Sequence, residues 1–211
     1  MKRIFKQSVA FFIGALVLVS SSVEAQNVID KNGKKQGVWS KSYPNGKVKY
    51  KGEFKDDKEI GKFLYYSKDG KLSQIIEYSE NSDLSKAKFL YKDGKLMSEG
   101  MYKNKKKEGA WSYYNEKGKK IQEEFFVAGI KNGKETNWDR NGKVTNTTMY
   151  KDGVKEGEFY QNLYADGYYI CNYSKDKRNG AFTFYFASSK KQCEGQYVND
   201  KKEGEWIYTN E

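Results

Sequence analysis

The sequence contains no histidine, one proline and only two cysteines among its 211 residues. Without histidine, neither a Ser-His-Asp nor a Cys-His catalytic arrangement can form, and a metal site built on imidazole is excluded. Two cysteines are too few for a disulfide framework or a four-thiolate zinc site. The residues therefore provide no familiar catalytic or metal-binding motif, and we expect neither a cofactor nor a bound metal.

Hydrophobic residues are also scarce, at 37%, although aromatic residues alone make up 16% of the chain. Disordered chains are poor in aromatic residues, so the composition argues against disorder despite a formal net charge of +11. Twenty glycines and eighteen tyrosines in so hydrophilic a chain favour a thin β structure over a thick globular core.

Residues 1–25 have the pattern of a secretory signal peptide. Basic residues (Lys2, Arg3 and Lys6) precede a short apolar run over residues 11–19, and a small-x-small site ends at Ala25. That apolar run is much shorter than the roughly 20 residues that span a bilayer. We therefore expect cleavage near Ala25-Gln26 and a periplasmic or secreted protein.

The rest of the chain, residues 26–211, is built from a repeat with a period of 24 residues. Three columns of residues recur at this spacing over about seven and a half units. The first column holds Gly37, Gly61, Ser85, Gly109, Gly133, Gly157, Gly180 and Gly204; the second holds Gly46, Gly70, Gly94, Gly118, Gly142 and Gly167; the third holds Phe54, Tyr78, Tyr102, Phe126, Tyr150, Tyr173 and Tyr197.

Each repeat is predicted to be a β-hairpin. Asn45-Gly46, Asp69-Gly70 and Asp93-Gly94 are hairpin-turn signals, and the flanking residues alternate between apolar and polar. An isolated hairpin is marginal in water, whereas stacked hairpins share a continuous stripe of buried side chains. The fold expected is all-β: an elongated, twisted array of stacked antiparallel hairpins, as an open sheet or solenoid.

Units such as residues 108–119 (Glu-Gly-Ala-Trp-Ser-Tyr-Tyr-Asn-Glu-Lys-Gly-Lys) and 202–208 (Lys-Glu-Gly-Glu-Trp-Ile-Tyr) resemble MORN repeats. They are most similar to the variant MORN class of the bacterial YwqK antitoxin-like family. The resemblance covers roughly residues 31–211. It implies a sheet of hairpins with a role in binding or assembly, and it brings no catalytic motif.

Two surfaces are candidates for binding. Five lysines follow the hairpin glycine in successive repeats and would form a cationic ladder along one edge of the sheet; they are Lys47, Lys71, Lys95, Lys119 and Lys143. Such a ladder suits an anionic partner, or it solvates the hairpin ends and prevents edge-to-edge association. The aromatic columns, including Trp39, Phe63 and Trp111, form the core or present rings to a sugar or peptide.

Repeat five departs from this pattern. Glu135 and Asn137 replace its aromatic residues, and Trp138 is expected on the opposite face. This repeat either packs loosely or presents a changed contact surface. Trp138, Tyr114 and Tyr66 complete the candidate binding surface.

The acidic residues do not indicate an active site. Glu123 and Glu124, or Glu99, would supply the carboxylate pair of a glycosidase, but cross-strand pairing with lysine explains them more simply. Cys171 and Cys193 occupy equivalent strands of successive repeats, about 9–10 Å apart in a regular meander. An oxidising compartment favours a disulfide between them and this geometry opposes it, so the sequence leaves the bridge open.

These observations predict an exported, non-enzymatic repeat protein that acts as a protein-binding or scaffolding surface, with a protein partner in the envelope or outside the cell. The alternatives are a cell-wall or glycan-binding module that uses the aromatic ladder, and a peripheral binder of anionic membranes. Export from the cytoplasm argues against nucleic acid as a partner.

Overall fold

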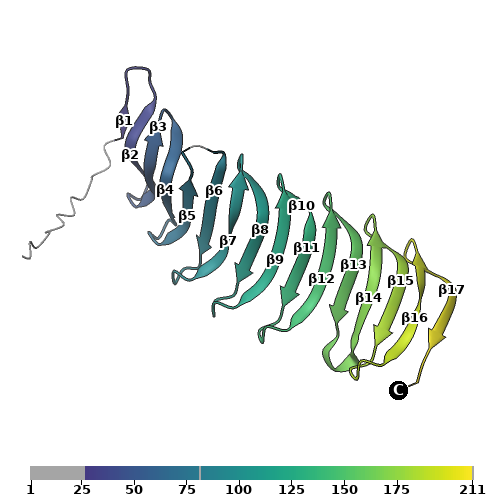
Figure 1. Ribbon diagram of the computed structural model, residues 1–211. Helices are drawn as coiled ribbons and strands as arrows, with labels where there is room; N and C mark the ends of the chain where they lie inside the picture. The colour runs from purple at the N-terminus through teal and green to yellow at the C-terminus, as the bar shows by residue number, and fades with distance from the viewer. Residues whose placement is uncertain (1–26, 81, 211) are drawn as a thin grey trace, which may run out of the picture.

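The computed structural model describes residues 27–80 and 82–210, which form one open antiparallel sheet (Figure 1). The predicted signal peptide lies outside the described residues. The strands are β1 (Val28–Ile29), β2 (Lys35–Ser42), β3 (Val48–Lys55), β4 (Lys58–Tyr66), β5 (Leu72–Tyr78), β6 (Leu84–Leu90), β7 (Leu96–Lys103), β8 (Lys106–Tyr114), β9 (Lys120–Val127), β10 (Ile130–Lys131), β11 (Gly133–Trp138), β12 (Val144–Lys151), β13 (Val154–Asn162), β14 (Tyr168–Ser174), β15 (Lys177–Tyr185), β16 (Lys191–Val198) and β17 (Lys201–Tyr208).

The strands pair in chain order, so the sheet is a continuous meander. β10 and β11 both pair with β9, so they are two segments of one interrupted strand. A short 3-10 helix, η1 (Tyr164–Asp166), lies between β13 and β14. The hairpins continue over the whole described chain, and the all-β prediction is confirmed.

The two edges of the sheet have different turns. At one edge the second-column glycines close four-residue turns; the N–H of Gly46 donates to the carbonyl oxygen of Tyr43 at 2.9 Å, and Gly46 has φ +80°. At the other edge two-residue turns such as Asp56-Asp57 have φ of +51° and +67°. Left-handed residues at both central positions match the right-handed twist of the flanking strands.

First-column glycines mark a β-bulge in most repeats. Lys51 pairs with Leu64 but Glu53 pairs with Ile60, so β4 carries extra residues around Gly61, whose φ is +60°. Ser85 takes this position between β5 and β6, and that pairing has no register shift. The repeat keeps its length because the connection from Tyr78 at the end of β5 to Leu84 at the start of β6 is longer than the two-residue turns of other repeats.

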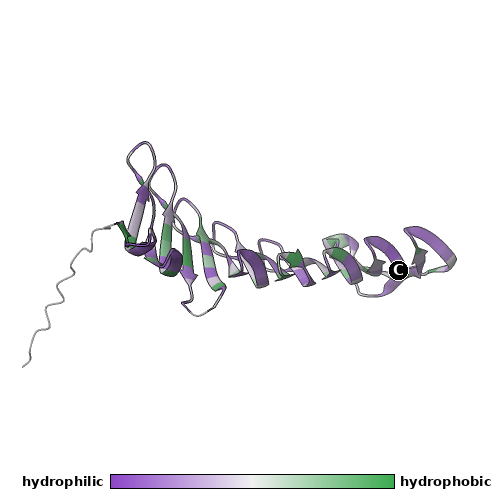
Figure 2. Ribbon diagram, turned by 90° about the horizontal axis from the view of Figure 1, so that it is seen from above, coloured by the Kyte–Doolittle hydropathy of each residue, from purple (hydrophilic) through white to green (hydrophobic). Residues whose placement is uncertain are grey.

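The sheet is a single elongated layer, and hydrophilic residues lie along its whole length (Figure 2). The side chains that are almost completely buried include Phe63, Trp111 and Cys171, each only 1% exposed. They lie on the same face of the sheet as the other packed aromatic residues, such as Phe54. We call this face the inner face. The core is therefore a stripe along one side of the sheet.

Candidate binding surfaces

The inner-face aromatic residues pack mainly against one another. Ring centroids of Phe54 and Phe63 lie 5.2 Å apart, and those of Tyr102 and Trp111 lie 5.0 Å apart, both edge to face. This arrangement is a favourable one for aromatic pairs. The rings therefore serve as the core of a sheet that has no second layer in its described part.

Pairs of facing residues on the inner face are complementary in size. A Cβ atom at Gly52 would lie 2.4 Å from the ring of Phe63, and one at Gly100 would lie 2.4 Å from the ring of Trp111. In repeat three the order is reversed, because Ile76 takes the glycine position and Ala87 the aromatic position. Each of these facing pairs thus combines one large and one small residue.

A column of cations that the sequence analysis missed covers the aromatic rings. Lys107 Nζ lies 4.5 Å from the ring centroid of Trp111 and 4.8 Å from that of Phe126. Burial lowers the pKa of Lys107. The residues with this role are Lys35, Lys107, Lys131, Lys155, Arg178 and Lys202. Their recurrence on the 24-residue grid was the signal available in the sequence.

Repeat five replaces the aromatic pair with a buried ion network. Lys131 Nζ contacts Glu124 Oε1 at 2.6 Å and also pairs with Glu135 Oε2. Tyr113 Oη donates to Glu124 Oε2 at 2.7 Å, and Asn137 Nδ2 donates to Glu135 Oε1 at 3.1 Å. Glu135 and Asn137 are thus held by polar contacts, and the repeat is not loosely packed on its inner face.

The network shifts the pKa values of its members in opposite directions. Burial alone would raise the pKa of Glu124, but hydrogen bonds from Lys131 and Tyr113 outweigh it and lower the pKa. Burial alone would lower the pKa of Lys131, but the two carboxylates outweigh it and raise the pKa. Both groups therefore carry their charge at neutral pH.

The five predicted ladder lysines are exposed and follow the turns at one edge of the sheet. Several already contact their own chain. Lys47 Nζ donates to the carbonyl oxygen of Asp69 at 2.8 Å, and Lys119 Nζ donates to that of Arg140 at 3.0 Å. Lys95 pairs with Asp93 at 2.7 Å, and Lys143 Nζ lies 5.6 Å from the Tyr164 ring centroid. The Lys71 ammonium group forms no hydrogen bond or ion pair with the described residues. The ladder therefore ties turns together as well as presenting charge.

Tyr66, Tyr114 and Trp138 end equivalent strands, β4, β8 and β11, beside the ladder edge. Tyr114 Oη donates to Glu99 Oε1 at 2.9 Å, which places it on the face opposite the aromatic core. Lys120 Nζ lies 6.0 Å from the ring centroid of Trp138. Tyr114 and Trp138 come from successive repeats, whereas Leu90 occupies the intervening position between Tyr66 and Tyr114.

The glutamates weighed as a catalytic pair each contact a lysine. Glu99 pairs with Lys88 at 3.8 Å and Glu124 with Lys131, both across strands, while Glu123 pairs with Lys120 at 2.6 Å within β9. Within residues 27–80 and 82–210, no group of acidic or cysteine side chains has the arrangement of a metal site. The same residues contain no helix long and apolar enough to cross a membrane.

Cys171 and Cys193 are free thiols. They lie on β14 and β16, and β15 separates them, with Phe182 opposite Cys171 and Phe184 opposite Cys193. Burial raises the pKa of the Cys171 thiol to about 11, so it is protonated at neutral pH.

Comparison with known families matches this geometry. The profile described as MORN repeat variant matches five segments, residues 35–56, 59–80, 85–104, 107–128 and 131–152, which together cover just over half of the chain. The chain belongs to the MORN repeat variant family. Its remaining hairpins, β13 to β17, lie outside the matched segments but continue the MORN pattern of strands and turns. Such repeats commonly mediate protein or membrane binding, which is compatible with a binding or scaffolding role.

No curated protein matches this MORN chain. Among solved structures, one match is a crystal structure of a mutant of S. aureus TarM in complex with fondaparinux, alpha-GlcNAc-glycerol and UDP. The match has 14% identity and a TM-score of 0.35, and covers 57% of this chain and 21% of that chain. So weak a likeness carries no information about function.

Proposed function

We propose that this chain is an exported, non-enzymatic scaffold whose open sheet binds a protein partner in the envelope or outside the cell. The observation that supports this most is the continuous single-layer sheet of MORN hairpins, which presents two faces and an edge of charged turns to solvent. The signal-peptide pattern of residues 1–25 supports export. Units such as residues 108–119 resemble those of YwqK antitoxin-like proteins, and this resemblance supports a role in binding a protein partner.

The arrangement of the inner face favours a protein partner over a glycan. Rings that would stack on a sugar are instead in contact with one another, and lysines cover them. Phe63 and Trp111 are each 1% exposed, so neither presents a free face. The accessible surface carries charged side chains together with exposed apolar ones such as Met97, Phe125 and Met149, and this mixture suits the apolar and polar groups of a protein interface.

An affinity capture of the chain lacking residues 1–25 from envelope extract tests this proposal. We expect one protein recovered in a stoichiometric amount and released by competing untagged chain. Retention on peptidoglycan or polysaccharide, with no protein enriched, would instead establish the glycan-binding alternative.

A further inference from the structure

The cation column of the inner face has two exceptions. A cation in the first or second position of a strand lies over the rings, at 4.0–5.2 Å from at least one centroid in every case; these cations are Lys35, Lys107, Lys131, Lys155, Arg178 and Lys202. On the same 24-residue grid, repeats two and three carry Glu59 and Asp83. Where the rest of the chain supplies its own cation, these two repeats supply a carboxylate.

A hollow of about 890 Å³ lies at this position and is lined by Glu59, Asp83 and Tyr78. It lies where the connection from β5 to β6 is longer than the tight turn found in other repeats. Tyr78 is half-buried, and its ring centroid lies 5.3 Å from that of Phe63. No lysine or arginine covers the ring of Tyr78 in the described chain, in contrast to its equivalents Phe126 and Tyr150.

Neither carboxylate has a partner among the described residues. Glu59 is half-buried, yet no ion pair or side-chain hydrogen bond of Glu59 or Asp83 occurs in that part of the chain. The equally inward-facing Glu124 and Glu135 are, by comparison, fully engaged by Lys131. A partly buried carboxylate is stabilised by a cation, so the position is suited to one from outside.

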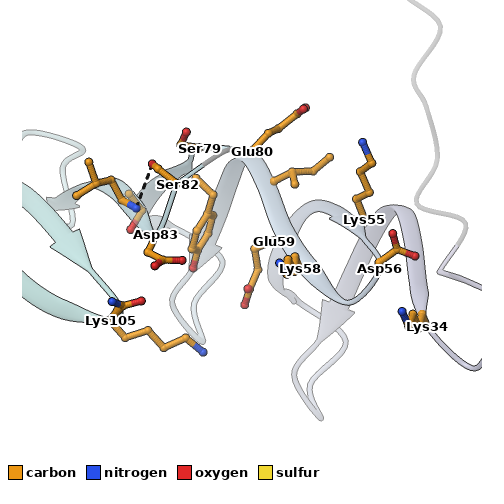
Figure 3. Close-up of a pocket in the computed structure, with 15 residues that line it drawn as sticks. Lys34, Lys55, Asp56, Lys58, Glu59, Ser79, Glu80, Ser82, Asp83 and Lys105 are labelled. Carbon is orange, nitrogen blue, oxygen red and sulfur yellow. Dashed lines mark hydrogen bonds between the residues drawn. The ribbon is translucent and has the colours of Figure 1, made fainter.

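Basic residues form the rim of the hollow. Lys34, Lys55, Lys58 and Lys105 line it together with Asp56 and Glu80. Figure 3 shows Glu59 and Asp83 toward the middle of the site, with Lys58 drawn beside Glu59 and with Lys34 beyond Asp56. The lining thus mixes four lysines with four carboxylates, and of these Glu59 and Asp83 occupy the positions that hold a cation in other repeats.

We propose that this hollow accepts a lysine or arginine side chain of the protein partner. The cation would take the place that Lys107 occupies in repeat four, over the aromatic ring, with Glu59 and Asp83 as its counter-ions. The rim lysines favour acidic residues beside that basic side chain. This site deepens the proposed protein-binding function and rests on it.

The test is an NMR titration of the isotopically labelled chain lacking residues 1–25. The probe is acetyl-Asp-Lys-Asp-amide, and the matched probe carries norleucine in place of lysine, so that rim attraction is common to both. We expect the lysine probe alone to shift the backbone resonances of Glu59, Tyr78 and Asp83. The full sequence has a formal charge of +11, of which residues 1–25 contribute only +2. The labelled chain is therefore strongly basic, and general electrostatic attraction does not favour the lysine probe.

Glu59→Lys restores the residue type found in the other repeats and should fill the site with the chain's own cation. We expect this variant to remain folded and to lose the lysine-specific shifts, and Glu59→Gln to bind about fivefold more weakly or worse. Glu77→Lys makes the same charge change at an exposed position on the opposite face and should leave the shifts unchanged.

Equal shifts with both probes, or lysine-specific shifts that persist in Glu59→Lys, would overturn the proposed site. This result is independent of the affinity capture. If the capture recovers a stoichiometric partner but the titration gives no lysine-specific shifts, the binding function is supported and the hollow is rejected as its site. If the titration gives lysine-specific shifts but the capture recovers no protein, the hollow is a cation site and the proposed protein-binding function is rejected.

Discussion

At the scale of single residues, the size match between glycine and aromatic side chains is the strongest constraint on the inner face. Replacing Gly100 with isoleucine places side-chain atoms where the Trp111 ring now lies. We expect this substitution to destabilise the chain by about 1–3 kcal/mol or more, as overpacking does. Urea denaturation of the variant measures the loss.

The chain itself supplies the compensating change for that variant. Ile76 pairs with Ala87 in repeat three, at the positions that Gly100 and the Trp111 ring packed on it take in repeat four. Adding Trp111→Ala to Gly100→Ile should therefore recover stability, so that the double variant is more stable than the single one. Additive losses in this double-mutant cycle would contradict the proposed size match.

The cysteines give a second prediction at this scale. Because β15 separates Cys171 from Cys193, we expect two free thiols per chain when the purified protein is unfolded without reductant. Before unfolding, the buried Cys171 thiol should react slowly with a thiol reagent, since its pKa is raised to about 11. A monomeric protein in which no free thiol is detected after unfolding would show that Cys171 and Cys193 form a disulfide.

At the scale of strands and turns, the ion network of repeat five should make stability depend on pH. The folded-state pKa of Glu124 lies below its ordinary value, so its contribution is complete above about pH 4.3 and is lost as the pH falls through the lower, folded-state pKa. We expect Glu124→Gln to cost about 1–3 kcal/mol at pH 7. That difference should be smaller at pH 3 than at pH 7.

Unfolding in urea at both pH values checks this prediction. Glu77→Gln is the matched control, because Glu77 is exposed on the opposite face of the sheet. A stability difference for Glu124→Gln that is the same at pH 7 and pH 3 would show that the loss comes from packing and not from charge.

Much of this level of structure could be predicted from the sequence. The period located each hairpin, and Asn-Gly and Asp-Gly pairs located the turns at one edge, because these features depend on local backbone preference. The bulge at the first glycine could not be predicted from spacing, since a glycine with positive φ is compatible with either a turn or a bulge. Ser85 occupies the expected grid position, but only the structure shows that its bulge is absent and that a hollow forms beside it.

The candidate site was less accessible to sequence reasoning. The ladder lysines stand where expected, yet Lys47 and Lys119 contact carbonyl groups of the following turns, a contact that depends on how adjacent hairpins stack. Glu59 and Asp83 become informative only when compared with the cations above equivalent rings. That comparison requires the inner face to be known, because alternation alone does not say which face buries its side chains.

At the scale of the whole molecule, the basic edge distinguishes a protein partner from a membrane. Lys47 and Lys119 keep their charge when they donate to carbonyl groups, so we expect weak sedimentation with phosphatidylserine-rich vesicles at low salt that is lost at physiological salt. Sedimentation that persists at physiological salt and disappears when the five ladder lysines are changed to glutamine would establish the membrane alternative.

The central claim is that the repeats form one continuous extended sheet, because every proposed surface requires residues 24 positions apart to lie side by side. Small-angle X-ray scattering of the chain without residues 1–25 tests this most directly. About 15 strand spacings of ~4.8 Å give a length of roughly 70 Å, and we predict a radius of gyration above about 20 Å with the distance distribution of a rod. A value near the ~16 Å of a compact domain of this size would contradict the account.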